Sequence, residues 1–283
     1  MPAMPEVTGV EHSEHDLATG VRVHVAAAGP PDAPPVLCLH GWPQHWWSWR
    51  EVIAELRDER RMLCPDLRGL GWSGLPADDD FRKDRLADDA IALLDVLGVD
   101  RARLVGHDWG AWAAIHAALR APDRFSSVLV MSGGSPWVPQ AVAARNAHRL
   151  AYQVPLALPF AGSRLVRDGA FPRKVLEVER RDGRRWQPYE LETYLAVLRD
   201  PATAHASSKL YRDFLLRELP AAAAGRFRDR RFTIPARMLH GRRDLLGLDM
   251  TKGFPGEVEI VEEAGHFLPE EVPALVADRI RAM

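Results

Sequence analysis

Cysteine is scarce in this chain of 283 residues, which contains only Cys38 and Cys64. Both stand in short apolar runs, so we expect reduced thiols in a buried core, with neither a disulfide nor a metal pair. Long apolar runs are missing as well: none approaches the roughly 20 residues that cross a bilayer, and residues 1–16 lack the apolar centre of a signal peptide. We therefore expect a cytoplasmic protein with no membrane partner.

A large excess of charge of one sign is also missing. The 37 lysines and arginines nearly balance the 39 aspartates and glutamates, which leaves a net charge of -2. This balance provides no general attraction to nucleic acid or to an anionic membrane, so we expect neither as a partner. Hydrophobic residues make up 47% of the chain, enough for a sizeable core, and both a monomer and a homodimer are compatible with this composition.

The order of apolar segments predicts an α/β fold with a doubly wound, mostly parallel sheet. Residues 8–27 alternate between polar and apolar side chains, which indicates an antiparallel hairpin at a sheet edge. Short, wholly apolar strands separated by helical stretches follow, as is typical of parallel strands covered on both faces. The expected strands are 35–39, 61–64, 103–105, 127–131, 236–240 and 258–261, and the expected helices are 47–58, 82–97, 110–121 and 273–282.

The alternation of strands and helices is interrupted once. Residues 135–225 carry helical patterns, prolines and many aromatic residues, with no convincing strand. We interpret this segment as a helical cap inserted into the core. The core itself then consists of a first part, residues 1–134, and a second part, residues 226–283.

Residues 104–111 (LVGHDWGA) are the stretch around which we expect an active site. An apolar run leads into Asp108, with Gly106 and Gly110 two residues to either side. This spacing is that of a nucleophile elbow, a sharp strand-to-helix turn that lifts one side chain above the sheet. The lifted residue is an aspartate, where the elbow motif has serine.

An aspartate nucleophile suits a different electrophile from serine. Attack on a carbonyl by a carboxylate would give an anhydride, whereas attack on a saturated carbon gives an alkyl ester. Water can hydrolyse that ester at its carbonyl, but a serine would be left as an inert ether. The elbow therefore predicts hydrolysis through an alkyl ester on Asp108.

Two residues after the last expected strands complete a triad. His266 follows the final strand and Asp244 follows the penultimate one, so both fall at the carboxyl edge, where open α/β sheets place their sites. The chain order of nucleophile, acid and histidine is that of an α/β-hydrolase triad. Weaker candidates for the acid are Asp249, Glu262 and Glu263.

The developing negative charge also needs hydrogen-bond donors. Residues 40–43 (HGWP) follow the strand 35–39, and a tight turn there would aim the amide of Trp42 at Asp108. The amide of Trp109 leads the next helix and points at the same carboxylate. We therefore expect the amides of Trp42 and Trp109 to form an oxyanion hole.

Over almost its whole length the chain resembles the α/β-hydrolase-fold epoxide hydrolases, the Asp-nucleophile branch related to haloalkane dehalogenases. The motifs that carry the resemblance are residues 40–50 (HGWPQHWWSWR), 66–73 (DLRGLGWS), 106–111 (GHDWGA) and 265–267 (GHF). The resemblance implies that a small apolar epoxide and water give a vicinal diol, with no metal and no organic cofactor. It also implies a cis bond between Trp42 and Pro43.

Opening an epoxide requires a proton donor for the leaving alkoxide. A tyrosine phenol, with an ordinary pKa of about 10, stays protonated at neutral pH and can serve. All four tyrosines fall in the expected cap. The resemblance implies two ring-opening tyrosines, of which Tyr211 matches the late one and Tyr152 the early one, and we assign Tyr189 and Tyr194 to packing.

Trp42, Trp46, Trp109 and Trp137 are the residues we expect to line an apolar substrate pocket between core and cap. Two other functions are compatible with the fold. A haloalkane dehalogenase would share the nucleophile, but such enzymes usually have asparagine at position 42 and lack the paired tyrosines. A non-catalytic ligand-binding protein would be expected to have lost part of the triad, which is complete here.

Overall fold

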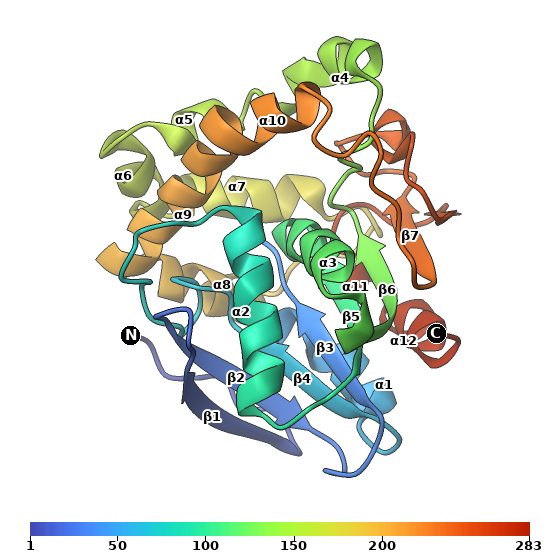
Figure 1. Cartoon of the computed structure of the whole chain (residues 1–283). Coiled ribbons are helices and arrows are strands. Elements are labelled where there is room, and N and C mark those ends of the chain that lie inside the picture. Colours follow the sequence, from blue (N-terminus) through green and yellow to red (C-terminus); the bar gives the residue numbers. More distant parts are fainter.

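An eight-stranded sheet runs through the computed structural model, which describes residues 1–283 (Figure 1). The strands are β1 (Val10–Asp16), β2 (Arg22–Ala28), β3 (Pro35–Leu39), β4 (Arg61–Pro65), β5 (Ala102–His107), β6 (Phe125–Met131), β7 (Ala236–Gly241) and β8 (Glu257–Val261). Their order is β1-β2-β4-β3-β5-β6-β7-β8. Strand β2 pairs antiparallel with β1 and β4, and all other pairs are parallel. The predicted mostly parallel sheet is confirmed.

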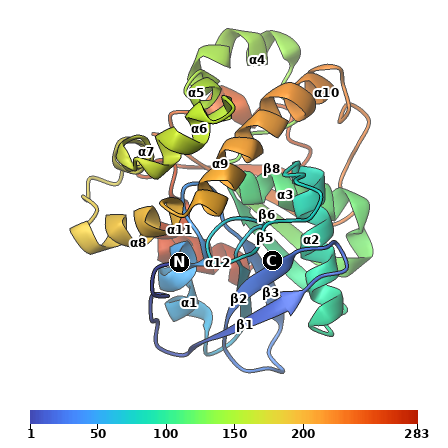
Figure 2. The ribbon, with the colours of Figure 1, turned by 90° about the vertical axis from the view of Figure 1, so that its left-hand side faces the viewer.

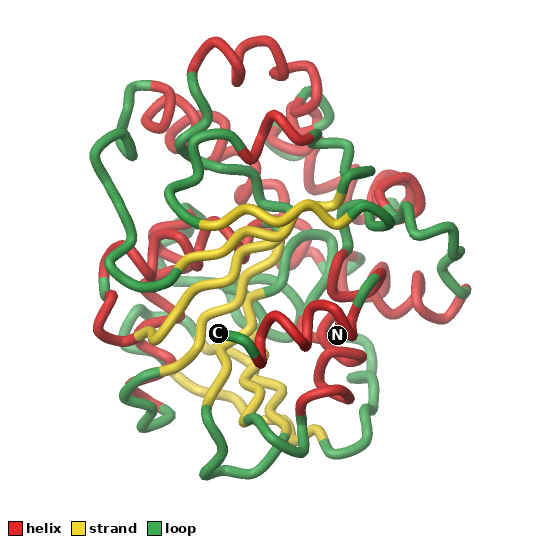
Figure 3. Tube along the Cα trace, turned by 90° about the vertical axis from the view of Figure 1, so that its right-hand side faces the viewer, coloured by secondary structure: helices red, strands yellow, loops and turns green.

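Helices cover both faces of this sheet. They are α1 (Arg50–Leu56), α2 (Lys83–Val96), α3 (Trp109–Arg120) and α12 (Pro273–Arg281), with the short α11 (Leu268–Glu271) before the last. Helix α2 packs against α3, and α1 packs against α12 on the opposite face (Figure 1). Figure 3 shows helices on both sides of the strands. Alanine-rich α3 is buried along most of its length, because its small side chains allow a close approach to the sheet. None of the helices combines the length and the apolar character needed to cross a membrane.

Between β6 and β7 the chain leaves the sheet and forms a helical insertion, residues 132–235. Its helices are α4 (Gln140–Asn146), α5 (Gln153–Ala157), α6 (Ala161–Arg167), α7 (Ala170–Glu179), α8 (Pro188–Leu198), α9 (Pro201–Asp213) and α10 (Leu219–Ala223). Figure 2 shows these helices gathered beyond one end of the sheet. All of them fall within the range 135–225 interpreted as a cap.

Buried charges tie helix α9 of the insertion to the core. The ammonium group of Lys83, in the first turn of α2, donates to the carbonyl oxygen of Leu210 at 2.8 Å and lies 3.0 Å from the carboxylate of Glu218. The backbone N–H of Phe81 donates to Asp213 at 3.1 Å. Glu218 ends a π-helical turn that links α9 to α10. Because an unpaired buried charge is costly, these contacts hold α9 in one position over the core.

Candidate active site

Asp108 stands in a strained turn between β5 and α3. Its φ is 52° and its ψ is -116°, a conformation that side chains other than glycine rarely adopt. Such strain costs about 1–3 kcal/mol and is found mainly at functional sites. No larger residue fits at the flanking glycines. A Cβ on Gly106 would lie 2.3 Å from the carbonyl oxygen of Gly110, and a Cβ on Gly110 would lie 2.2 Å from the carbonyl oxygen of Leu39.

The amides predicted to form an oxyanion hole lie beside this carboxylate. The N–H of Trp42 donates to Oδ1 of Asp108 at 2.9 Å, and the bond between Trp42 and Pro43 is cis, as the resemblance implies. Burial raises the pKa of Asp108, while His266 and the amides of Trp42 and Trp109 act in the opposite direction. The turn after β3 and the start of α3 thus supply donors that stabilise the ionised carboxylate.

His266 links Asp108 to Asp244. Its Nδ1 lies 3.1 Å from Oδ2 of Asp244, and its Nε2 lies 3.7 Å from Oδ2 of Asp108. The other oxygen of Asp244 accepts from the N–H of Leu246 at 2.8 Å. These residues come from the loops after β8, β5 and β7, so the carboxyl edge of the sheet brings the predicted triad together.

The carboxylates around His266 keep its imidazole protonated. Burial alone would lower the pKa of His266, but Asp244, Glu179 and Asp108 outweigh it and raise the pKa to about 10. For Asp244 burial acts in the opposite sense and would raise the pKa, but the neighbouring His266 and His240 bring that pKa below its usual range. The resting arrangement is therefore an imidazolium between carboxylates.

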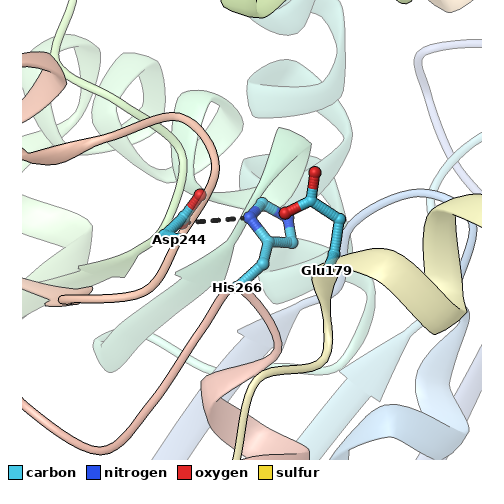
Figure 4. Close-up of side chains that lie close together, drawn as sticks. All are labelled: Glu179, Asp244 and His266. Carbon is cyan, nitrogen blue, oxygen red and sulfur yellow. Dashed lines mark hydrogen bonds and ion pairs between the residues drawn. The ribbon is translucent and has the colours of Figure 1, made fainter.

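Glu179, the last residue of α7, also belongs to this group, although no motif in the sequence predicts it. In Figure 4 its carboxylate and Asp244 flank the imidazole of His266. One oxygen from each acid and one ring nitrogen of His266 lie within 4.8 Å of one another. Burial raises the pKa of Glu179 to about 7. Nothing in the sequence marks this glutamate, because it stands at the end of a helix among many other charged residues.

Donor groups this close together could also reach a metal ion. However, His266 and Asp244 already bond each other at 3.1 Å, and the second oxygen of Asp244 is held by the backbone. A cation bound between them would have to break the hydrogen bond that orients the imidazole. The donor set therefore suits an acid–base chain better than a metal site.

Two tyrosines of the insertion lie together near Asp108. Tyr211, on α9, is buried with its ring between the indoles of Trp42 and Trp109, at 5.2 Å from each centroid. The ring of Tyr152 lies 6.4 Å from that of Tyr211. Burial, together with the charge of Asp108, raises the pKa of both phenols. Both therefore stay protonated, as proton donors must.

The remaining tyrosines have other surroundings. Tyr189 is 63% exposed at the surface. The phenol of Tyr194 is buried and donates a hydrogen bond to Oε1 of Glu270. The same oxygen accepts a hydrogen bond from the guanidinium of Arg50 at 2.6 Å. The position of Tyr194 agrees with its assignment to packing, whereas Tyr189 is too exposed to pack in the core.

The predicted pocket tryptophans divide into two pairs. Trp42 and Trp109 flank Tyr211, but the structure does not bring Trp46 and Trp137 to Asp108. The indole of Trp46 packs at 4.9 Å from the ring of His12, because the short turn 46–49 faces the N-terminal hairpin. The indole of Trp137 lies in an aromatic cluster formed by Phe227, Phe232 and Phe254. These positions do not support the expectation that Trp46 and Trp137 line the substrate pocket.

Other aromatic residues extend from Trp109 along α3. Phe214 packs on Trp109 at 4.8 Å and on Trp112 at 5.3 Å, which continues the aromatic wall along α3. Trp112 also lines an apolar cavity of about 370 Å³ between α4 and α10. Its further lining includes Val138, Ala143, Leu150, Leu219 and Met250. No motif in the sequence singles out these residues.

Comparisons with known proteins agree with this architecture. The family profile described as alpha/beta hydrolase fold matches residues 34–273. The AB hydrolase superfamily protein YfhM of Bacillus subtilis (strain 168) is 29% identical over 272 residues, which cover 91% of this chain and 92% of that protein. Epoxide hydrolase 4 of Mus musculus is 28% identical over 277 residues, which cover 91% and 75% of the two chains.

Solved structures show the same likeness in three dimensions. The epoxide hydrolase CorEH without ligand superposes with a TM-score of 0.79 at 27% identity, over 95% of this chain and 96% of that chain. The resemblance to epoxide hydrolases is thus confirmed by relatives that carry this name. With a profile match over most of its length and the expected sheet, this chain belongs to the α/β-hydrolase fold family.

Proposed function

We propose that this protein is an epoxide hydrolase that converts a small apolar epoxide into a vicinal diol through an alkyl ester on Asp108. The observation that carries the proposal is a pair of phenols, buried Tyr211 and half-buried Tyr152, beside a carboxylate on an elbow. A carboxylate can displace an alkoxide from carbon, and a protonated phenol can donate to that alkoxide as it leaves.

In the first step, Oδ2 of Asp108 attacks an epoxide carbon while Trp42 holds Oδ1. A carbon–oxygen bond to Asp108 forms and the ring carbon–oxygen bond breaks. The released alkoxide takes the phenol proton of Tyr211, and Tyr152 supports it with a second hydrogen bond. Raised pKa values keep both phenols protonated until a strongly basic alkoxide is present.

In the second step, the ester is hydrolysed. Ester formation removes the charge of Asp108, one of the groups that raise the pKa of His266, so the imidazole can then lose its proton. Neutral His266 takes a proton from water as it attacks the ester carbonyl, and the amides of Trp42 and Trp109 stabilise the oxyanion. The tetrahedral intermediate collapses as its bond to the diol oxygen breaks, and the departing alkoxide takes the proton from His266. The second proton of the water is left on Asp108 and passes through solvent to the phenolate of Tyr211, which restores both the carboxylate and the phenol.

We also propose that the helical insertion acts as a cap that shields this reaction from bulk water. It supplies both phenols, and α9 is tied to the core by the buried contacts of Lys83. The aromatic wall of Trp109, Trp112 and Phe214 supports an apolar substrate.

A haloalkane dehalogenase is the second candidate, favoured by one observation. The indole N–H of Trp42 is buried and has no acceptor within the protein, so it could bind a departing halide, and the indole of Trp109 lies beside the phenol of Tyr211 in the same place. Such a reaction would leave the phenol pair without a role. A non-catalytic ligand-binding protein would in turn leave the triad without one.

An assay that measures both products distinguishes these functions. Purified protein is given aromatic and aliphatic epoxides alongside chloro- and bromoalkanes, and diol and halide are measured separately. We expect diol from at least one epoxide and little halide. Halide release without diol would favour the dehalogenase, and binding without turnover of either class would favour the non-catalytic alternative.

A further inference from the structure

Glu179 is attached to the loop of His266 through the backbone. The N–H of His266 donates to the carbonyl oxygen of Glu179 at 3.2 Å. Gly265 permits this approach, because a Cβ there would lie 2.7 Å from the same oxygen. The end of α7 is thus fixed against the histidine, and the side chain of Glu179 is delivered beside the imidazole (Figure 4).

The carboxylate of Glu179 is only partly satisfied. One oxygen is stabilised by the N–H of Leu245, but Oε2 is buried and receives no hydrogen bond from the protein. A buried carboxylate oxygen without a donor is costly, and native structures usually satisfy such atoms. Asp244, on the other side of the ring, uses both of its oxygens in hydrogen bonds. The two acids therefore differ in what they can still bind.

Ester hydrolysis brings a hydrogen-bond donor, the attacking water, close to His266. A water that attacks the ester of Asp108 gives one proton to Nε2 of His266, and its second O–H must point elsewhere. One carboxylate oxygen of Glu179 lies within 4.8 Å of a ring nitrogen of His266, a separation that a bridging water can span. A carboxylate that accepts the second O–H restrains the water and aims its lone pair at the ester carbon.

We infer that Glu179 holds the hydrolytic water, so that the insertion contributes to both steps: its phenols open the epoxide and its glutamate orients the water. This inference rests on the proposed function, because it concerns the ester on Asp108. Glu179 acts as a hydrogen-bond acceptor through Oε2. The proton that leaves the water goes to His266 and from there to the diol.

The surroundings of Glu179 permit its ionised form near neutral pH. Burial raises the pKa of Glu179 to about 7, Asp244 adds to this effect, and His266 and Arg181 oppose it. Asp108, the remaining acid near the ring, is neutral once it is esterified. Above neutral pH Glu179 is therefore a charged acceptor during hydrolysis.

The test compares Glu179→Gln with Glu177→Gln in single-turnover experiments. Glu177 lies on the same helix, is exposed and pairs with Arg173 at 3.8 Å, so it is a matched control. Each protein is mixed with an epoxide that the wild type hydrolyses, and the ester is followed by intact mass after quenching. We expect Glu179→Gln to form the ester at about the wild-type rate and to hydrolyse it about 10- to 100-fold more slowly. The control should behave like the wild type.

The pH dependence separates holding water from a mere effect on His266. If the charge of Glu179 only raised the pKa of His266, Glu179→Gln would reach the wild-type maximum rate of hydrolysis, with its rise moved to lower pH. That result would overturn the inference. We expect Glu179→Gln to hydrolyse the ester more slowly than the wild type at every pH, including the pH at which its rate is highest.

A second variant covers the case in which Glu179→Gln is poorly folded. In Glu179→Ala, added formate should restore part of the rate of ester hydrolysis, and a variant that needs no formate to match the wild type would overturn the inference. The wild type and His266→Gln are measured first. If they form no ester, the proposed function fails and this inference with it; if ester forms but decays normally in both Glu179 variants, only this inference fails.

Discussion

Nε2 of His266 lies 3.7 Å from Oδ2 of Asp108, while the opposite ring nitrogen bonds Asp244 at 3.1 Å. In a serine hydrolase the histidine removes the proton of the nucleophile. In the proposed mechanism Asp108 attacks as an anion, which the amide of Trp42 and the positive charge of His266 favour against the effect of burial, so it needs no base. In this mechanism the histidine is required only after the ester has formed.

Replacing His266 by glutamine should accordingly trap the intermediate. Asp108 can still attack the epoxide, but no base activates the water, so the ester accumulates. Mass spectrometry of His266→Gln after exposure to an epoxide should show protein heavier by one substrate, with the added mass on the peptide that contains Asp108. A folded variant without adduct, on a substrate that the wild type turns over, would mean that another residue is the nucleophile.

Tyr211→Phe should slow ring opening about 100-fold or more, because it removes one proton donor and keeps the packing against Trp42 and Trp109. The double variant with Tyr152→Phe should be slower still. Ester formation is the quantity to measure, with exposed Tyr189→Phe as the control. Nearly full activity in folded Tyr211→Phe would show that the donor is another group.

Lys83→Met should destabilise the protein, because it leaves Glu218 buried without its cation. Removing one partner of a buried ion pair typically costs about 3–5 kcal/mol, which urea unfolding would detect. Adding Glu218→Leu should recover part of the loss, since no charge is then left unpaired. The exposed pair of Arg242 and Glu262 provides the control, and Arg242→Met should change little. Equal stability of Lys83→Met and wild type would contradict a role for this pair in holding α9.

The stability of the resting protein should fall at alkaline pH partly through His266. Its pKa is raised to about 10 in the folded protein and is about 6.5 in an unfolded chain, so the folded state binds the extra proton between these values. The resulting stabilisation is complete below pH of about 6.5 and is lost as the pH rises through about 10. Urea unfolding at neutral and alkaline pH should show a smaller loss in His266→Gln. An identical loss in both proteins would place the imidazole in its neutral form at rest.

Removing metal ions should leave the activity unchanged. Glu179, Asp244 and His266 are close enough to bind a cation, but in the proposed mechanism the imidazole bonds Asp244 directly. Dialysis against a chelator, followed by the epoxide assay, tests this point. Activity that is lost and then restored by a divalent cation would instead make these three groups a metal site.

The sequence by itself determined the sheet and the carboxyl-edge part of the site. Short apolar runs bounded by turn residues predict buried strands. The glycines around Asp108 predict a tight turn, because their backbone lies too close to neighbouring backbone to leave room for a Cβ. Asp244 and His266 were found because each directly follows a strand. Parallel strands end at one edge, so a position in the sequence implies a position in space.

Only the tertiary structure decided which residues of the insertion face that edge. Tyr194 and Tyr211 are both buried on helices, yet one bonds Glu270 and the other packs beside Trp42. Glu179 reaches His266 only because α7 ends against Gly265. Helices of an insertion have no common edge to align them, and their local pattern records which face is buried but not what lies opposite it. That partner is set by long-range packing, which the sequence of each helix does not contain.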